Sequence, residues 1–380
     1  MPLALTDEQE ALVAAVRDLC AREAGTREQR DALTERNAVP HNEALSRRIG
    51  ELGWLGIPFA EEHGGMGGGA VDTCLFLEEV AYGLLPIGGI GPTWIVGAAI
   101  ERFGSPEQRR AVIGDIVAGS SAAIAMSEPG AGSDVAALTC RAERVDGGWR
   151  VNGQKTWISN GPWAAHTLLV ARSDATGRKH DGLTMLHVPA GTPGVEIRAI
   201  ETMGGREQAD VYFTDALLPE EAVVGEVGGA WRQLMAGLNT ERLILAALML
   251  GRARRAFDDA LAYVKQREQF GRPIGSFQVL KHRLADHATE LECCALLVYD
   301  VARRVDADPQ AMLSKESSMV KLKVTEVAKA VALDGMQMMG GYGYATEHDM
   351  ERHVRDTVVS TIYGGTSEVQ REIIGAALGL

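Results

Sequence analysis

The chain has 380 residues, which is too many for one small hydrophobic core and predicts two to three domains. Its net charge of −13 argues against a nucleic acid as partner, and its five cysteines, without a C-x-x-C pair, argue against a disulfide framework or a metal site. No apolar run approaches the ~20 residues of a membrane-spanning helix, so we expect no membrane span.

Residues 1–118 predict an N-terminal helical domain. Apolar side chains recur there at helical spacing, as at Leu12, Val16 and Leu19. Thr6 and Gln9 form a capping-box pattern, which predicts that the first helix begins after Thr6. Because this helix starts so close to Met1, with no basic leader before it, we expect a cytoplasmic protein. The glycine-rich segment 61–69 lacks the Lys-Ser/Thr pair of a phosphate-binding P-loop, and we interpret it as a loop between helices.

Residues 119–225 predict a small β-domain. Short runs with strand composition occur at His166–Ala171, Leu183–Val188, Val195–Ile200 and Val211–Phe213. Turn dipeptides such as Asn152-Gly153 punctuate this region. Strands and helices do not alternate, so a Rossmann sheet is not expected.

Residues 226–380 predict a helical bundle. One long apolar stripe recurs at three- and four-residue spacing, from Phe277 to Val305, and Ser276 is the expected N-cap of that helix. Arg267–Gly271 and Gln337–Gly341 are typical of helix ends stopped by glycine. Ile362–Thr366 precede the final helix, and backbone N–H groups at a helix start can hold an anion.

One glutamate lies on an apolar stripe of this bundle. Glu241 is spaced by three, four or seven residues from Leu234, Leu238, Leu245 and Leu248. An unpaired charge is expensive to bury, and burial raises the pKa of a carboxyl group toward neutrality, which suits a general base. The alternative is a structural ion pair between Glu241 and Arg242 or another buried arginine.

Two segments of the β-domain have the composition of a ligand site. Small residues between Ser127 and Asp134 follow an apolar run and would let a planar ligand approach the backbone. Trp157, flanked by hydroxyl side chains at Thr156 and Ser159, is suited to packing on a flavin. The alternatives are an ordinary turn and a core tryptophan.

Six stretches together resemble the acyl-CoA dehydrogenase family, in the family's order and over almost the whole chain. They are Met126–Asp134, Val151–Gly161, Leu238–Ala247, Tyr263–Gln278, Gln337–Gly343 and Arg355–Ile374. The resemblance implies a mainly α protein with a central β-domain: an N-terminal helical domain, a middle β-barrel-like domain and a C-terminal four-helix bundle, at residues 1–118, 119–225 and 226–380. It also implies FAD between the β-domain and the bundle, and a homotetramer built as a dimer of dimers.

The resemblance also assigns roles to individual residues. The strand and turn that hold the flavin match Met126, Ser127, Gly132 and Ser133, and the segment on its other side matches Trp157, Ile158 and Ser159. Contacts to the pyrophosphate and adenosine across the dimer match Arg267, Gln269, Phe270, Gln278, Gln337, Gly340 and Gly341. Contacts near the adenine match Thr366 and Glu368. Contacts to the acyl-CoA match Ser133, Leu238, Arg242, Tyr363 and Gly365.

The catalytic base departs from the commonest family pattern. Many members carry the glutamate in a Tyr-Glu-Gly-Thr motif, which here reads Tyr363-Gly364-Gly365-Thr366 and lacks the carboxylate. A minority branch, including long-chain and isovaleryl-CoA dehydrogenases, carries it on a bundle helix at the position of Glu241. The resemblance thus implies Glu241 as the base, while the Gly364 N–H holds the thioester carbonyl. The retained Tyr363 resembles the long-chain and general type more than the isovaleryl type.

The implied reaction is FAD-dependent α,β-dehydrogenation of an acyl-CoA to the trans-2-enoyl-CoA, as in fatty acid β-oxidation, with electrons passed to an electron-transfer flavoprotein. One alternative is dehydrogenation of an acyl or aminoacyl group on a carrier protein, because such relatives also carry a bundle-helix glutamate. Another is a non-catalytic, FAD-holding subunit of a hetero-oligomer. The motifs do not define the length, branching or ring character of the acyl group.

Overall fold

The structure is a computed structural model that describes residues 4–380, apart from the side chains of Ala236, Leu238 and Asn239. The chain divides into two compact units. The helical unit comprises Met1–Ala32, Ala70–Leu85 and Asn239–Leu380. The sheet unit comprises Leu33–Gly69 and Pro86–Leu238. Among the described residues, no helix is both long and apolar enough to cross a membrane. The three-domain division expected from the sequence stays a prediction.

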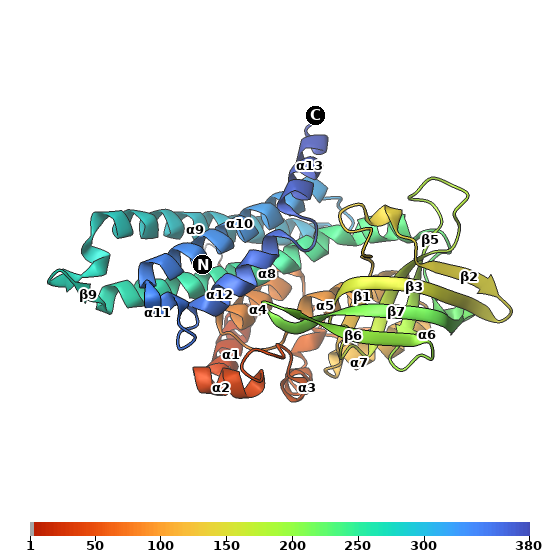
Figure 1. Ribbon diagram of the computed structural model, residues 1–380, viewed down its shortest axis with the longest axis horizontal. Helices are drawn as coiled ribbons and strands as arrows, with labels where there is room; N and C mark the ends of the chain where they lie inside the picture. Colours follow the sequence, from red (N-terminus) through yellow and green to blue (C-terminus); the bar gives the residue numbers. More distant parts are fainter. Residues whose placement is uncertain (1–3) are drawn as a thin grey trace. The chain divides into compact units, whose positions relative to one another are not determined.

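Long helices that run side by side form the centre of the helical unit (Figure 1). They are α8 (Ala230–Gln266), α9 (Gln278–Ala307) and α10 (Ser314–Met339). The shorter helices are α1 (Asp7–Ala24), α2 (Arg27–Leu33), α4 (Ala70–Tyr82), α11 (Gly341–Tyr344), α12 (Met350–Val358) and α13 (Ser367–Ala377). Gly251 of α8 allows α4 to come close, because a Cβ at this position would stand 2.1 Å from the carbonyl oxygen of Glu78.

A buried polar cluster also joins α4, α8 and α9. Glu78 of α4 is only 2% exposed, and it accepts hydrogen bonds from Arg254 of α8 and from the Tyr299 hydroxyl of α9. A carboxylate without such partners would be costly at this depth. The cluster therefore fixes how α4 sits against the long helices.

The structure confirms two expected helix ends and corrects a third. The Thr6 hydroxyl accepts from the backbone N–H of Gln9 at 3.2 Å and completes the expected capping box of α1. Gly340, with φ of +62°, ends α10 as expected. Ser276 was wrong as an N-cap, because it lies in a 3-10 turn and α9 begins only at Gln278.

The segment Arg267–Gly271 is part of a β-hairpin, and its assignment as a glycine-stopped helix end was wrong. β9 (Glu268–Gln269) pairs with β10 (Arg272–Pro273) directly after α8. Phe270 and Gly271 between them have φ of +52° and +75°, as a type I′ turn requires. This turn leaves the Phe270 ring 92% exposed.

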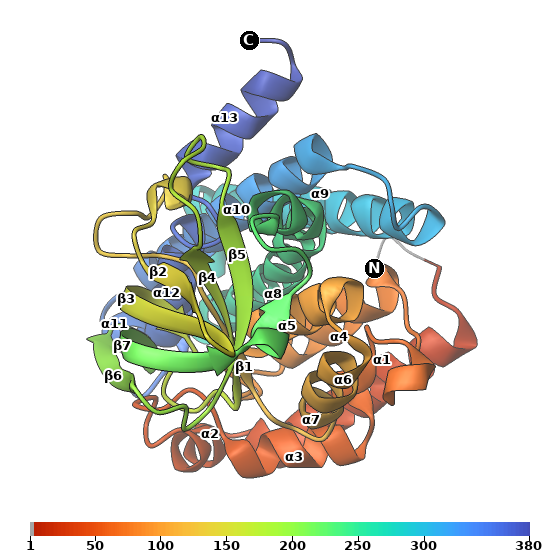
Figure 2. The same ribbon diagram turned by 90° about the vertical axis from the view of Figure 1, so that its right-hand side faces the viewer.

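An eight-stranded sheet forms the centre of the sheet unit, in the order β6-β7-β3-β2-β4-β5-β8 with β1 paired to β4 (Figure 2). The strands are β1 (Ala122–Ala125), β2 (Arg141–Val145), β3 (Gly148–Ser159), β4 (His166–Arg172), β5 (Leu183–Pro189), β6 (Val195–Thr202), β7 (Gly205–Pro219) and β8 (Val223–Val224). The helices are α3 (Glu43–Glu51), α5 (Ile90–Phe103), α6 (Pro106–Gln108) and α7 (Gly114–Val117). The four β-rich runs expected from the sequence lie in β4, β5, β6 and β7.

The Asn152-Gly153 dipeptide lies inside β3, and its assignment as a turn was wrong. The pairing of β3 with β7 shifts register between Val151 and Gly153, which is a bulge. Gly153 has φ of +147°, and the Asn152 side chain donates to Asp215 of β7 at 3.0 Å. The dipeptide therefore bends a long strand and does not end it.

Candidate active site

The loop Tyr363–Thr366 precedes α13 and has a conformation that needs glycine. Gly364 and Gly365 have φ of +59° and +81°, in the left-handed region that residues with a Cβ rarely adopt. The Thr366 hydroxyl accepts from the backbone N–H of Val369 at 3.3 Å and caps α13. Backbone N–H groups at such a helix start favour negative charge.

The side chain of Glu241 on α8 faces this loop. A Cβ at Gly364 would stand 3.6 Å from Oε1 of Glu241 and 2.4 Å from Cδ1 of Leu245. No hydrogen-bond acceptor for the Gly364 N–H occurs among the described residues. The structure thus brings together a carboxylate and a backbone donor, which are the two groups that the sequence assigned to catalysis.

Burial raises the pKa of the Glu241 carboxyl group, and the charges of Arg242 and Lys321 partly offset this rise. None of the described lysines and arginines forms an ion pair with Glu241. Arg242 is only 4% exposed, and its Nε has no hydrogen-bond partner in the described part of the chain. The alternative of an ion pair between Glu241 and an arginine is therefore not observed, and the carboxylate has the environment of a base.

Two side chains hold the carbonyl groups of the loop. Lys321 of α10 donates to the carbonyl oxygen of Gly365 at 2.8 Å. Gln370 of α13 donates to the carbonyl oxygens of Gly364 and Gly365 at 3.0 and 3.1 Å. Neither residue was singled out from the sequence, and the role of Lys321 depends on a contact across 44 residues that no local pattern reveals.

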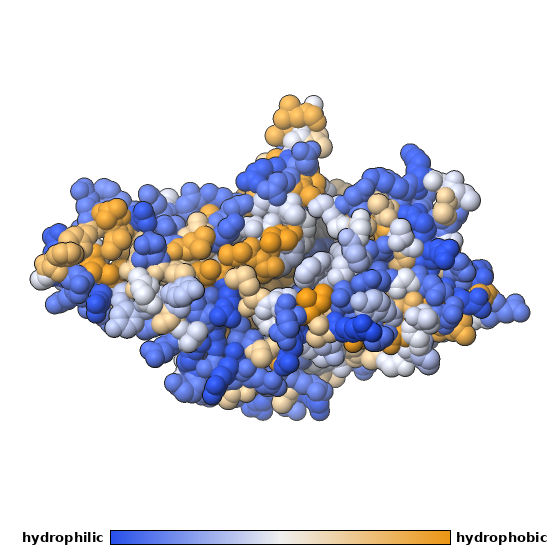
Figure 3. Space-filling model, in the orientation of Figure 1, coloured by the Kyte–Doolittle hydropathy of each residue, from blue (hydrophilic) through white to orange (hydrophobic). Residues whose placement is uncertain are grey.

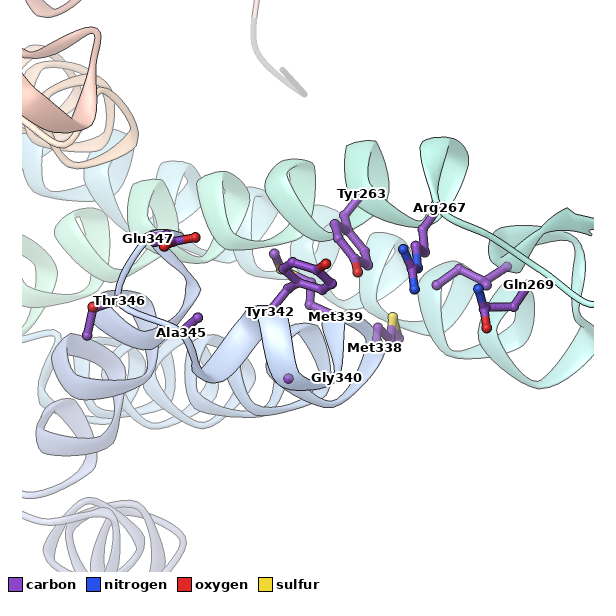
Figure 4. Close-up of a pocket in the computed structure, with 12 residues that line it drawn as sticks. Tyr263, Arg267, Gln269, Met338, Met339, Gly340, Tyr342, Ala345, Thr346 and Glu347 are labelled. Atoms are coloured by element: carbon purple, nitrogen blue, oxygen red, sulfur yellow. The ribbon is translucent and has the colours of Figure 1, made fainter.

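A hollow of about 750 Å³ lies in the helical unit at the C-terminal end of α8, far along this helix from Glu241 (Figure 4). Four residues that the sequence assigned to FAD contribute to its lining: Arg267, Gln269, Gly340 and Gly341. Figure 4 shows Tyr263 and Tyr342 beside Arg267 in this hollow. The guanidinium of Arg267 lies 5.6 Å from the centre of the Tyr342 ring, and the two tyrosine rings are 6.1 Å apart. The sequence did not single out these aromatic side chains.

The remaining residues expected at this end do not line the hollow. Gln337, Phe270 and Gln278 are exposed on the surrounding surface. Glu368 lies in the first turn of α13, whose N-cap is Thr366, and it is not among the residues that line this hollow. The side chain of Leu238, expected at the substrate, lies outside the described residues.

In the sheet unit, the segment after β1 is tied to β3. The backbone N–H of Thr156 donates to the carbonyl oxygen of Ser127 at 2.9 Å, and Lys155 donates to that of Met126 at 2.9 Å. Lys155 also donates to Glu128 at 2.8 Å, and this pair is almost fully buried. The two segments that the sequence assigned to the flavin are therefore held together.

The exposed residues of these segments include Trp157, Gly132 and Ser133. Trp157 has φ of +59° and is 61% exposed, so the alternative of a core tryptophan was wrong. Ile158 is buried in the core of the sheet unit, so only its backbone can face a ligand. The Ser159 hydroxyl accepts from Gln208 at 2.9 Å.

No group of three or more His, Cys, Asp or Glu side chains within residues 4–380 is arranged to hold a metal ion.

Three family models match this chain. They are "Acyl-CoA dehydrogenase, N-terminal domain" over residues 6–120, "middle domain" over residues 123–216 and "C-terminal domain" over residues 228–379. The chain is 38% identical over 355 residues to isovaleryl-CoA dehydrogenase, mitochondrial, of Oryza sativa subsp. japonica. That alignment covers 91% of this chain and 86% of the relative.

Solved structures are similar over nearly the full length. An acyl-CoA dehydrogenase from Geobacillus kaustophilus matches with a TM-score of 0.92 and 33% identity, covering 99% of each chain. The prolyl acyl carrier protein oxidase AnaB matches with a TM-score of 0.92 and 26% identity, covering 99% of this chain and 100% of the other.

Proposed function

Because this chain belongs to the acyl-CoA dehydrogenase family, we propose that it catalyses the FAD-dependent α,β-dehydrogenation of an acyl-CoA thioester to the trans-2-enoyl-CoA. The observation that carries the proposal is the placement of Glu241 against the glycine loop Tyr363–Thr366. The pKa of its carboxyl group is raised, no basic side chain of the described residues forms an ion pair with it, and a backbone donor lies beside it.

Glu241 would remove the α-proton of the substrate. The Gly364 N–H would donate to the thioester carbonyl and stabilise the negative charge that develops there, as an oxyanion hole does. Arg242 would lie beside the thioester, and its buried Nε supplies a donor for that part of the substrate. Exclusion of water by Leu245 and Tyr363 would strengthen each of these electrostatic interactions.

The sheet unit offers the features that a flavin needs. Trp157 presents an exposed aromatic surface, and Gly130 and Gly132 have open space where a Cβ would stand. These features support FAD as the cofactor, held by Met126, Ser127, Gly132, Ser133 and Trp157–Ser159. The FAD, when bound, would accept the hydride from the substrate Cβ.

A homotetramer, built as a dimer of dimers, is part of this proposal. Arg267 follows Glu241 by 26 residues (267 − 241), almost all of them in α8, so at 1.5 Å per residue the two stand roughly 39 Å apart along the helix. One FAD molecule is too short to reach both. The hollow at Arg267 therefore supports binding of the adenosine end of a cofactor whose flavin belongs to another copy of this chain.

The acyl group and the electron acceptor follow from the family. We propose an acyl-CoA as substrate and an electron-transfer flavoprotein as acceptor, in the cytoplasm. The likeness to a carrier-protein oxidase supports a second candidate, in which the thioester is carried by a protein. Relative rates with free acyl-CoA and with the same acyl group on a loaded carrier protein distinguish the two.

Anaerobic mixing of the purified flavoprotein with a panel of acyl-CoA thioesters tests the proposal. The panel holds straight chains of several lengths, isovaleryl-CoA and a ring-bearing acyl group, and at least one member should bleach the flavin absorbance. Glu241→Gln should keep its FAD spectrum and lose the bleaching, whereas Glu292→Gln on the exposed face of α9 should behave as wild type. Turnover of Glu241→Gln near the wild-type rate would refute the assignment of the base.

A further inference from the structure

A lysine ammonium is buried beneath the glycine loop. Lys321 on α10 has no exposed surface, although a buried ammonium is expensive to maintain. Its Nζ donates to the carbonyl oxygen of Gly365 at 2.8 Å and lies 5.9 Å from the centre of the Tyr363 ring. A neutral side chain would fill this space at lower cost, so the charge calls for an explanation.

We propose that Lys321 is a positioning residue for proton abstraction: its ammonium holds the Gly364-Gly365 turn against α8 and keeps the Glu241 carboxylate ionised. This inference rests on the proposed function of Glu241, and it goes further by assigning a role to a residue on a different helix. Lys321 acts through the loop and through the carboxylate, without contact to the reacting atoms.

The first part of the role is mechanical. Two successive glycines with positive φ have many alternative conformations, so this turn needs outside contacts to keep one of them. Lys321 from α10 and Gln370 from α13 both donate to the Gly365 carbonyl oxygen. Only the φ and ψ angles of the two glycines separate that carbonyl from the Gly364 N–H, so anchoring the carbonyl restricts the directions that this N–H can take toward the thioester carbonyl.

The second part of the role is electrostatic. Burial raises the pKa of Glu241, and the positive charges of Arg242 and Lys321 counteract that rise. Burial lowers the pKa of Lys321 to about 8, against the attraction of Glu241. The other charges that act on Lys321 are Arg242 from α8, Glu326 on α10 and Glu368 on α13. Loss of the ammonium would therefore favour protonation of the base.

Three variants separate these roles. Lys321→Met removes the donor and the charge, Lys321→Gln keeps a donor without the charge, and Lys323→Met is the matched control. Lys323 lies two residues later on α10 and forms an ion pair with Glu290 at a half-exposed position. Its loss should leave the Tm and kcat/KM near the wild-type values, because exposed ion pairs contribute little to stability.

The first measurement follows Glu241 directly in the resting enzyme. Infrared difference spectra against Glu241→Gln isolate the carbonyl stretch of the protonated Glu241 carboxyl group as a function of pH. Lys321→Met and Lys321→Gln should both move the titration midpoint to higher pH, whereas Lys323→Met should match wild type. An unchanged midpoint in both Lys321 variants would overturn the electrostatic part of the proposal.

The second measurement is the pH profile of kcat/KM. At neutral pH, Lys321→Met should lose between about tenfold and about a hundredfold, and this deficit should narrow as rising pH ionises Glu241. Lys321→Gln should retain more activity, since its amide still reaches toward Gly365. A deficit that is equal at every pH, with normal flavin content and Tm, would show a merely structural lysine and overturn the inference.

The outcome is separable from that of the proposed function. If Glu241→Gln keeps its turnover, Glu241 is not the base, even if the Lys321 variants shift the titration midpoint of its carboxyl group. Conversely, Glu241→Gln can be inactive while the Lys321 variants leave the titration midpoint of Glu241 unchanged. This result would leave the proposed function intact and refute only the role of the lysine.

Discussion

The ionised carboxylate of Glu241 lowers the stability of the folded chain. Burial raises its pKa above the ordinary value, so the folded chain binds this proton more tightly than the unfolded chain does. The stability gained from the neutral acid is complete below the unfolded pKa of about 4.3 and is lost as the pH rises through the folded pKa. At neutral pH the ionised group therefore costs stability, which is typical of a residue retained for function.

Glu241→Gln is accordingly expected to raise the Tm at neutral pH, because the amide does not ionise. The difference from wild type should shrink toward about pH 4, where the carboxyl group is protonated in both folded and unfolded chains. Thermal unfolding across this pH range checks the prediction, with Glu292→Gln as the exposed control. A Tm below that of wild type at neutral pH would contradict the raised pKa.

Gly364 is the second residue on which the site depends. Gly364→Ala places a methyl group against Leu245 and close to Glu241, so activity should fall at least about tenfold. Gly191→Ala is the matched control, because Gly191 also has positive φ, +76°, yet has open space around its Cβ position. Both changes should cost about 1 kcal/mol of unfolding free energy, and only the first should lower kcat. Equal kcat in the two variants would exclude a role for this close approach.

At the scale of elements, a buried ion pair between Glu128 and Lys155 helps to hold the segment after β1 to β3. Glu128 accepts from Lys155 and from the backbone N–H groups of Thr139 and Cys140, at 2.8, 2.7 and 2.8 Å. Burial alone would raise the pKa of Glu128, but Lys155 and these N–H groups lower it overall. The stability that this carboxylate contributes is present above its unfolded pKa and is lost as the pH falls through the folded pKa.

Lys155→Met should therefore destabilise the sheet unit by about 3–5 kcal/mol, because it leaves a buried carboxylate unpaired. It should also weaken FAD retention, since Met126 and Glu128 lose the lysine that ties them to β3. Lys179→Met removes an exposed pair with Asp134 of the same segment and should cost less than about 1 kcal/mol. Chemical denaturation and flavin content of the two variants check this, and similar losses in both would argue against the buried pair.

Local patterns predicted the elements that local forces define. The capping box at Thr6, the glycine stop at Gly340 and the four β-rich runs were all readable, because each depends on neighbours in sequence. Two of the errors share one cause. Asn152-Gly153 was predicted as a turn and Arg267–Gly271 as a helix end, yet pairing between strands makes the first a bulge inside β3 and the second a β-hairpin.

The candidate site divides in the same way. The sequence predicted Glu241 because a charge interrupts an apolar stripe, and the family resemblance predicted a role for Gly364. Lys321 was not predicted, since its distinguishing property is a bond to a carbonyl group 44 residues later in the chain. Tyr263 and Tyr342 were not readable for the same reason, because one lies on α8 and the other on α11, and their rings meet only in the folded chain.

At the scale of the whole molecule, exposed apolar side chains gather on parts of the helical unit. Figure 3 shows them near the β9-β10 hairpin and at the tip of α13. They include Phe270, Val279, Leu378 and Leu380, which are 60% to 96% exposed. Clusters of this kind mark surfaces for association, which agrees with the proposed homotetramer.

Native mass measurement should give about four times the chain mass of 40.7 kDa. Phe270→Asp should yield smaller assemblies and a lower FAD content, because a charge would enter a contact between copies. Met312→Asp is the control: Met312 is 65% exposed but lies in the loop beyond the far end of α9. A monomeric wild type with full FAD content would contradict the shared cofactor site.

The claim on which the account depends is that Glu241 takes a proton from the carbon next to a thioester. A thioester with an acidic α-hydrogen and no transferable β-hydrogen isolates that step, because no hydride can follow. In deuterated water the wild-type enzyme should exchange deuterium into the α-position, and Glu241→Gln with full FAD content should not. Exchange by Glu241→Gln at the wild-type rate would show that another group is the base.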